Sequence, residues 1–171
     1  MATSVADGVS LWSRFTAKAE LIGAAVMRTS SDEAAAELLR EATSGFAYTR
    51  SLAERYPIVA SAGHVATHDP ATEVVSIARF AVAETGSVAL DEPRDDRGAC
   101  FLAQRLWLLV PEPHILGSLD EAMPRMRDLV QQGAHHPLLM TGPSRTADIE
   151  RTLTVGVHGP RALVIVVVGG A

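Results

Sequence analysis

Apolar residues fall along this chain in short runs that are separated by polar and turn residues. Two uninterrupted apolar runs, 106–110 and 162–168, are typical of strands buried on both faces of a parallel sheet. A short run at 24–27 predicts another buried strand. More mixed runs predict the remaining strands at 46–48, 58–60, 80–83, 88–90 and 137–140.

Helical spacing of apolar residues predicts helices between several of these runs. The first covers about 10–21, where Leu11 and Phe15 recur four residues apart. Ser118 and Glu121 have the spacing of a capping box and predict the start of a later helix, although a proline lies awkwardly inside it. The other predicted helices cover 34–43, 51–56 and 119–131.

Alternation of strands and helices indicates the fold class. We expect an α/β protein whose mostly parallel sheet is covered by helices on both faces. Right-handed crossovers then bring the loops that follow the strands to one edge. The 171 residues fit one domain, 1–171, and the segments 61–72 and 92–98 are expected to be surface loops.

Composition narrows the classes of function. A net charge of -5 without a basic run argues against nucleic acid or an anionic membrane as partner. Cys100 is the one cysteine, so these residues hold neither a disulfide framework nor a cysteine-rich metal site, and its apolar neighbours predict a small core residue. The longest apolar run is seven residues, whereas a membrane helix needs about 20. Without a visible signal peptide, we expect a soluble, cytoplasmic protein.

The stretch 141–160 is the first candidate for a functional site. It places polar and turn residues between two apolar runs, as a working loop between two strands does. Gly142 and Pro143 predict a turn, and Ser144 or Thr146 can then cap a short helix. We therefore expect a strand, a loop, a helix and a second strand in this order.

Such a helix start would suit an anion. Free backbone N–H groups, two hydroxyls and Arg145 at the positive end of a helix dipole can hold a carboxylate or a phosphate. The alternative is a capped structural turn in which Arg145 pairs with Asp148 or Glu150. The residues alone leave both interpretations open.

A second candidate is the turn of Glu84, Thr85, Gly86 and Ser87. A carboxylate at the end of a buried strand, beside a glycine that lets a ligand approach the backbone, can serve as a nucleophile or general base. The simpler interpretation is a tight turn between two strands with Glu84 exposed.

Histidines are the remaining candidates. His158 can be an acid, a base or a ligand contact, or it can simply hydrogen-bond the backbone of its turn. His64 and His68 are four residues apart, as in helical zinc sites, but Gly63 and Pro70 disfavour a helix there, and we predict no metal. The chain has no GxGxxG, GxxxxGK or GxSxG motif.

Two of these segments resemble a known family. TGPSRTADIERTLTVGVHGPRALVIVVV, residues 141–168, is similar to the C-terminal signature of the LUD domain family, the LutC-like proteins of bacterial lactate utilisation. FAVAETGSV, residues 80–88, is similar to the family's second signature. The chain departs from the pattern at Arg79, where relatives commonly have aspartate, and at 103–105, where many have a Pro-Pro-x-His run.

The resemblance implies a NagB/RpiA/CoA-transferase-like fold and a place in a system that oxidises L-lactate. In that system the iron-sulfur clusters belong to partner subunits, so no cofactor is expected in this chain. The family supplies no catalytic mechanism residue by residue, but Glu84 matches its motif by position, and its place at the end of a buried strand makes it the predicted catalytic residue. The predicted ligand-binding residues are Thr85, Gly86, Ser87, Thr141, Gly142, Pro143, Ser144, Arg145, Thr146, Asp148, His158 and Gly159.

Three functions follow as hypotheses. The first is an accessory, non-redox subunit of an L-lactate or 2-hydroxy acid oxidation system that binds a small anion between Glu84 and Arg145. The second is a stand-alone transferase or isomerase that acts through Glu84 on a CoA ester or a sugar phosphate. The third is a structural interaction protein.

Overall fold

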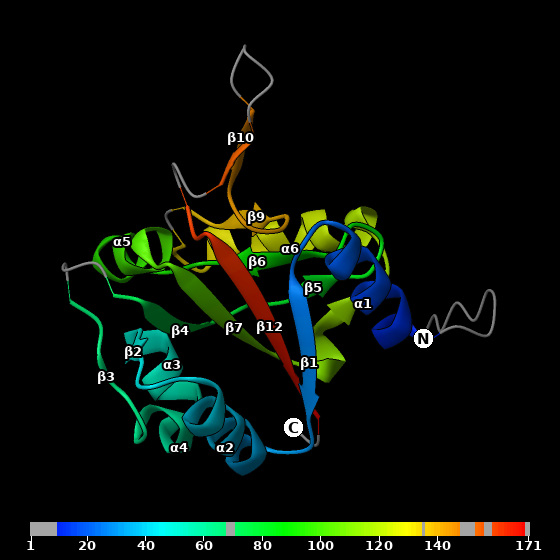
Figure 1. Ribbon diagram of the computed structural model, residues 1–171. Coiled ribbons are helices and arrows are strands. Elements are labelled where there is room, and N and C mark those ends of the chain that lie inside the picture. Colours follow the sequence, from blue (N-terminus) through cyan, green and yellow to red (C-terminus); the bar gives the residue numbers. More distant parts are fainter. Residues whose placement is uncertain (1–9, 68–70, 135, 148–152, 156–158, 170–171) are drawn as a thin grey trace.

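The computed structural model describes residues 10–67, 71–134, 136–147, 153–155 and 159–169. Its centre is a six-stranded sheet in which every neighbouring pair is parallel (Figure 1). From one edge to the other, the strands are β1 (Ala25–Thr29), β12 (Ala162–Val168), β7 (Arg105–Pro111), β4 (Glu73–Ile77), β2 (Ala47–Tyr48) and β3 (His64–Val65). The two uninterrupted apolar runs are the neighbours β12 and β7, which confirms their prediction as buried strands.

Helices cover one face of this sheet. They are α2 (Asp32–Ala42), α3 (Arg50–Arg55) and α4 (Pro57–Ala60), which lie together below the sheet in Figure 1. Leu39 and Leu52 pack there with Trp107 of β7 and Val166 of β12. The odd-numbered residues of β7 and the even-numbered residues of β12 point to this face, because side chains alternate along a strand. This apolar layer forms one half of the core.

The other face is covered by a second sheet and two helices. The second sheet contains, in order, β8 (Ile115–Leu116), β5 (Ala81–Val82), β6 (Ser87–Leu90) and β9 (Leu138–Met140). The helices α1 (Leu11–Leu21) and α5 (Arg94–Leu102) contribute Phe15 and Cys100 to the core between the two sheets. The mostly parallel α/β fold is confirmed, with a mixed sheet supplying part of the cover.

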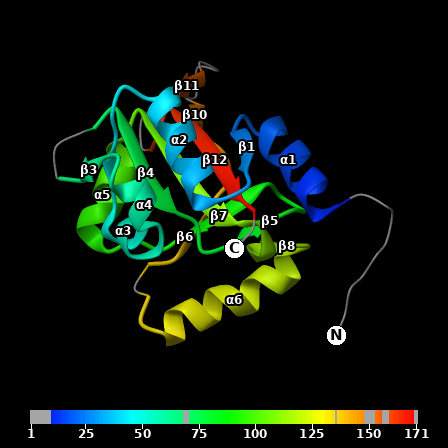
Figure 2. The same ribbon diagram turned by 90° about the horizontal axis from the view of Figure 1, so that it is seen from below.

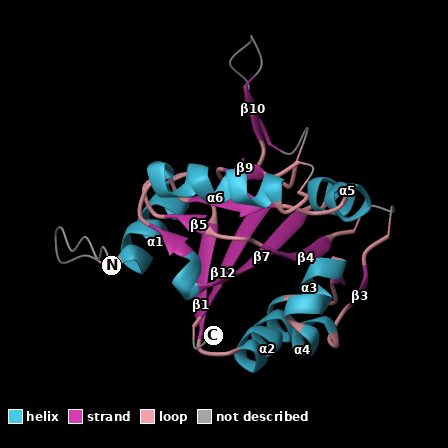
Figure 3. Cartoon of the chain, turned by 180° about the vertical axis from the view of Figure 1, so that it is seen from behind, coloured by secondary structure: helices cyan, strands magenta, loops and turns pink. Residues whose placement is uncertain are grey.

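A fourth layer lies outside the second sheet. The helix α6 (Leu119–Gln131) follows the short 3-10 turn Glu112–His114 and β8, and packs on the second sheet's outer face through Ala122 (Figures 2 and 3). As the capping spacing predicts, the Ser118 hydroxyl accepts a hydrogen bond from the Glu121 N–H, and Pro124 lies inside the helix. Among the described residues, no helix combines the length and apolar character needed to cross a membrane.

Two predictions for the first half of the chain were wrong, and one strand was not predicted. Residues 58–60 belong to the helix α4, because Pro57 occupies its first turn and favours helical geometry there. The strand β4 at Glu73–Ile77 was missed, since Glu73 and Ser76 interrupt its apolar run. The strand β1 is a sheet edge with several exposed residues and is not buried throughout.

Two predictions for later segments were also wrong. The expected surface loop at 92–98 contains the start of the helix α5, and Glu92 and Asp96 are buried. The helix expected after Ser144 is a hairpin of β10 (Arg145–Ala147) and β11 (Leu153–Val155), which pair antiparallel and project from the body in Figure 1. Thr146 pairs with Thr154 in this hairpin, and β-branched residues favour strands.

Candidate functional site

The predicted turn between β5 and β6 packs against the first helix. Gly86 has a φ of +70°, and a Cβ atom added to it would lie 2.5 Å from the backbone nitrogen of Ala19 in α1. Only glycine tolerates both the left-handed conformation and this close approach. The turn is therefore fitted to the backbone of α1.

Glu84 is exposed beside this turn. Its Oε2 accepts a hydrogen bond from the Leu119 N–H at 2.8 Å, so the carboxylate caps the start of α6, where the helix dipole favours a negative charge. A cavity of about 380 Å³ lies next to Glu84 and is also lined by Arg14 and Lys18 of α1. The catalytic role of Glu84 stays a prediction, and its observed contact is structural.

Hydroxyl groups join the two predicted motifs. The Ser87 hydroxyl lies 2.8 Å from the Thr85 hydroxyl and 2.8 Å from the Thr141 hydroxyl. Gly142 has a φ of +81°, and a Cβ there would lie 2.7 Å from the Ile22 carbonyl oxygen, just after α1. The two signature segments thus meet at the C-terminal end of α1.

The C-terminal signature, residues 141–168, continues away from this junction. The Ser144 N–H donates to the Pro160 carbonyl oxygen at 2.9 Å, and a Cβ on Gly159 would lie 3.1 Å from the Ser144 Cβ. Arg145 and Thr146 belong to β10 rather than to a helix start, so the predicted helix-dipole seat for an anion does not form there. Asp148 and His158 lie outside the described residues. The ligand-binding roles in this segment stay predictions.

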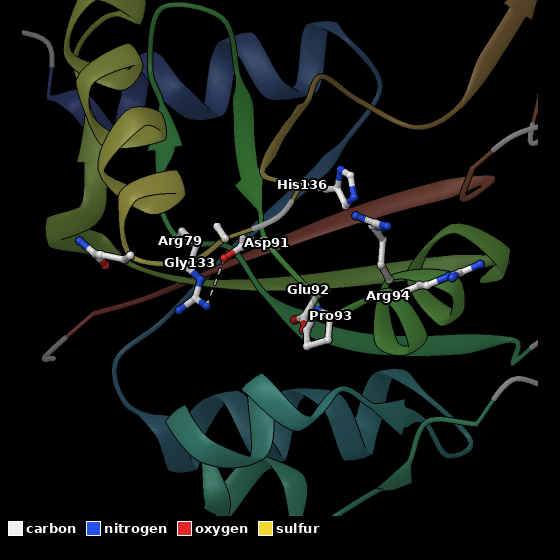
Figure 4. Close-up of a pocket in the computed structure, with 10 residues that line it drawn as sticks. Arg79, Asp91, Glu92, Pro93, Arg94, Gly133 and His136 are labelled. Atoms are coloured by element: carbon white, nitrogen blue, oxygen red, sulfur yellow. Dashed lines mark ion pairs between the residues drawn. The ribbon is translucent and has the colours of Figure 1, made fainter.

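A larger cavity lies on another part of the molecule. It measures about 510 Å³ and opens between the first turns of α5 and the residues that follow α6 (Figure 4). Its wall includes Arg79, Asp91, Glu92, Arg94, Arg97 and His136. None of these was predicted as a site residue from the sequence.

The charges of this cavity are mostly positive at its rim. Arg79 forms an ion pair with Asp91 at 3.6 Å, which offsets one cation with one anion. Arg94 and Arg97 contribute two further guanidinium groups from α5, and His136 lies near Arg94 in Figure 4. Guanidinium groups bind carboxylates and phosphates through paired hydrogen bonds, so the rim suits a small anion.

Glu92 forms part of the wall and is almost completely buried, with 4% of its surface exposed. Its Oε1 accepts hydrogen bonds from the hydroxyls of Thr49, Ser51 and Ser76. The distance from Oε1 to the Thr49 hydroxyl oxygen is 3.0 Å. Its Oε2 is buried and has no hydrogen-bond partner among the described residues. Burial raises the pKa of Glu92, although these hydroxyls oppose the rise, and the nearby charge of Asp96 adds to it.

Asp96, four residues after Glu92, is a second buried carboxylate and lies in the first turn of α5. It is 2% exposed, and its Oδ2 accepts a hydrogen bond from the Arg50 backbone N–H at 2.9 Å. Cys100, one more turn along α5, is buried as predicted, and burial raises the pKa of its thiol. A thiol held in its neutral form is a poor nucleophile, so the acidic side chains are the chemically interesting groups here.

The sequence contains a helical pattern over α5. Asp96, Ala99, Cys100 and Ala103 are spaced as one face of a helix, and Asp95 and Asp96 lie in the first turn after Pro93. The burial of Glu92 has no comparable signal, because its three hydroxyl partners come from residues 49–76. The cavity therefore depends on tertiary contacts.

The two positions that depart from the LUD pattern have different roles. Arg79 lines the large cavity, whereas Arg105 forms an ion pair with Glu73 at 3.1 Å. The Trp107 indole N–H donates to the other oxygen of Glu73 at 2.7 Å. Arg105 is therefore part of a strand-to-strand contact between β4 and β7.

Possible metal ligands are dispersed in the described part of the chain. His64 is exposed on the edge strand β3, and His68 lies outside the described residues. Within those described, no group of three or more histidine, cysteine, aspartate or glutamate side chains is arranged to hold a metal ion.

Replacing Glu92 with glutamine is expected to remove a pH-dependent loss of stability. Because the pKa of Glu92 is raised above 4.5, the folded protein keeps this proton to a higher pH than the unfolded chain does. As the pH rises from about 4.5 through the raised pKa, the unfolded state binds fewer protons than the native state, and the native protein loses stability. The free energy of unfolding, measured with urea across this window, should fall less in E92Q than in the wild type.

The exposed residue Glu37 provides the control for this measurement. The substitution Glu37→Gln should leave the pH profile of stability close to that of the wild type, because an exposed surface pair contributes little. Parallel profiles for E92Q and the wild type would contradict the raised pKa.

Comparisons with known proteins agree with the architecture. Residues 71–168 match the family model described as the LUD domain. The chain is 32% identical over 99 residues to Lactate utilization protein C of Geobacillus thermodenitrificans, which covers 55% of this chain and 41% of that protein. It is 34% identical over 104 residues to the protein of the same name from Deinococcus radiodurans, covering 59% and 48%. The chain spans less than half the length of these curated relatives.

A solved structure is similar over nearly the whole chain. It is described as a DUF162 family protein from Deinococcus radiodurans, and it superposes with a TM-score of 0.68 at 21% identity. The superposition covers 94% of this chain and 99% of that structure. At this identity the likeness establishes the shared fold.

Proposed function

The chain belongs to the LUD domain family, and on this premise we propose that it takes part in the utilisation of lactate or a similar 2-hydroxy acid. Its role would be that of an accessory, non-redox subunit that binds a small carboxylate. The observation that carries the proposal is the cavity of about 510 Å³ with Arg94 and Arg97 in its wall.

The charge of the cavity favours a carboxylate. Arg79 is paired with Asp91, so the two arginines of α5 supply the positive charge available to a ligand. A carboxylate can accept two parallel hydrogen bonds from one guanidinium, and the partly enclosed wall limits competition from water. The names of the similar curated proteins supply the link to lactate.

The redox chemistry of such a system would lie elsewhere. Cys100 is the chain's one cysteine and is buried, so its 171 residues cannot supply a set of cysteine ligands for an iron-sulfur cluster. We therefore place the iron-sulfur clusters on partner subunits. Affinity purification of the tagged chain from lactate-grown cells should recover iron-sulfur proteins, and recovery of the chain without them would count against the subunit role.

Removing the two α5 arginines is expected to weaken binding of L-lactate by at least about tenfold, because each charge-assisted hydrogen bond contributes about 1.5–3 kcal/mol. Isothermal titration of L-lactate into the wild type and the Arg94→Ala/Arg97→Ala double variant measures this effect. Arg127→Ala is the matched control, since Arg127 is exposed on α6 and outside the cavity wall. Equal affinities in the double variant and the wild type would refute this site.

A further inference from the structure

We infer that the proposed carboxylate site extends into a second cavity and holds acids whose apolar tail is longer than that of lactate. The carboxylate lies against Arg94 and Arg97, and the tail lies on the apolar floor of the second cavity. This inference rests on the proposed function, because it assigns the substrate class of the same site.

The second cavity lies beside the first. It measures about 190 Å³, and its wall shares Arg79 and Gln132 with the cavity of about 510 Å³. Arg79 precedes β5, and Gln132 directly follows α6. In Figure 4, Arg79 lies at one end of the first cavity and Arg94 at the other. A ligand that is held at Arg94 and extends past Arg79 therefore enters the second cavity.

The walls of the two cavities differ in chemistry. Most side chains of the first are charged or polar, and its apolar ones are those of Pro93 and Ala134. The second contains Phe80, Leu116 and Leu129, which belong to the apolar layer between the second sheet and α6. Phe80 is buried, and the two leucines are half-buried. The first cavity therefore suits a charged group, and the second suits an apolar one.

The charged groups of the second cavity leave its floor available. His114, Arg125 and Asp128 line it and are exposed, so a tail on the floor need not remove their water. The Arg79 guanidinium pairs with Asp91 at 3.6 Å. Its aliphatic stem can then cover the tail where the ligand passes from one cavity to the other.

The size of the site also favours a ligand larger than lactate. Pockets of about 300–1,000 Å³ hold drug-sized ligands, and the first cavity alone measures about 510 Å³. A three-carbon acid would leave the leucines of the second cavity uncovered. Each CH₂ group that is buried there should raise the affinity by about fourfold, because it is removed from water.

The test compares saturated monocarboxylates of increasing length. Isothermal titration of propionate, butyrate and hexanoate into the wild type should give an affinity for hexanoate at least about tenfold higher than for propionate. 1-Hexanol has the same tail without the carboxylate, and it should bind at least about tenfold more weakly than hexanoate. Equal affinities for propionate and hexanoate would overturn the inference.

Substitutions in α6 locate the tail. Leu129→Ala should lower the affinity for hexanoate by at least about threefold and leave that for propionate unchanged, since only the longer acid reaches this side chain. Val130→Ala is the matched control, because Val130 is the next residue, is 56% exposed and lies outside both walls. The same hexanoate affinity in Leu129→Ala and the wild type would place the tail elsewhere and refute the second subsite.

Methyl NMR of the wild type locates the tail without a substitution. Saturating hexanoate should shift the methyl resonances of Leu116 and Leu129, whereas saturating propionate should leave them in place. Resonances that stay unshifted with hexanoate would overturn the inference, even if Leu129→Ala does not fold.

Failure of the inference differs from failure of the proposed function. The Arg94→Ala/Arg97→Ala double variant should weaken propionate and hexanoate by the same factor, because both acids use the same carboxylate contacts. Equal affinities for the two acids in the wild type, both lost in the double variant, would remove the tail site and leave the arginine site intact. Absence of binding by every acid would overturn both.

Discussion

Replacing Gly86 with alanine is expected to destabilise the protein by about 2–5 kcal/mol, because strain and overpacking act together. The backbone at Gly86 has a φ of +70°, which disfavours any side chain. The new methyl group would also lie 2.5 Å from the Ala19 nitrogen and 2.7 Å from the Lys18 carbonyl carbon. Both neighbours are backbone atoms of α1 and cannot rotate away.

Two other glycines separate the strain from the clash. Gly45 has a φ of +137° with nothing within 4 Å of an added Cβ, so Gly45→Ala should cost the strain alone, about 1–3 kcal/mol. Gly98 lies in α5 with open space around it, and Gly98→Ala should stabilise the protein by up to about 1 kcal/mol. Urea denaturation of the three variants measures this order, and a Gly86→Ala protein as stable as Gly98→Ala would contradict the packing of this turn on α1.

Truncation of Leu108 to alanine is expected to cost about 2–5 kcal/mol. Leu108 is fully buried at the centre of β7, opposite Ile165 on one side and Ser76 on the other. The removed atoms lose their transfer free energy, and two flanking strands prevent the cavity from closing. Thermal and urea unfolding should both show the loss.

Leu21 gives the matched control for this substitution. It is the last residue of α1 and is 76% exposed, so Leu21→Ala should change the free energy of unfolding by less than about 0.5 kcal/mol. Equal effects of the two substitutions would show that β7 does not form the centre of the core.

The sequence pattern predicts best where one local signal decides the structure. The strands β7 and β12 are uninterrupted apolar runs, and serine residues mark the starts of α1, α2 and α6. It fails where two signals compete: Pro57–Ala60 is apolar enough for a strand, but its proline begins a helix. The hairpin of β10 and β11 was mistaken for a helix because capping residues also occur in turns.

The candidate sites show the same division. The two signature segments lie together in the folded chain, since the Ser87 and Thr141 hydroxyls are in contact. The cavity beside Glu92 could not be predicted in this way, because its wall joins residues 91–97 to residues 132–136, which meet only in the folded chain. Residues 92–98 are rich in charges, and such a run predicts an exposed loop from the sequence alone. The burial of Glu92 becomes evident only from its hydroxyl partners Thr49 and Ser76 in the folded chain.

The position of β12 has a consequence for synthesis on the ribosome. This strand lies between β1 and β7, with Val164 opposite both Ala25 and Trp107. Among the described residues β1 pairs with β12 alone, so β1 has no neighbour in the sheet until residues 162–168 have been made. Such distant parallel pairing is slow to form and leaves apolar strand edges open during translation. We expect the nascent chain to remain protease-sensitive and bound to chaperones until β12 leaves the exit tunnel.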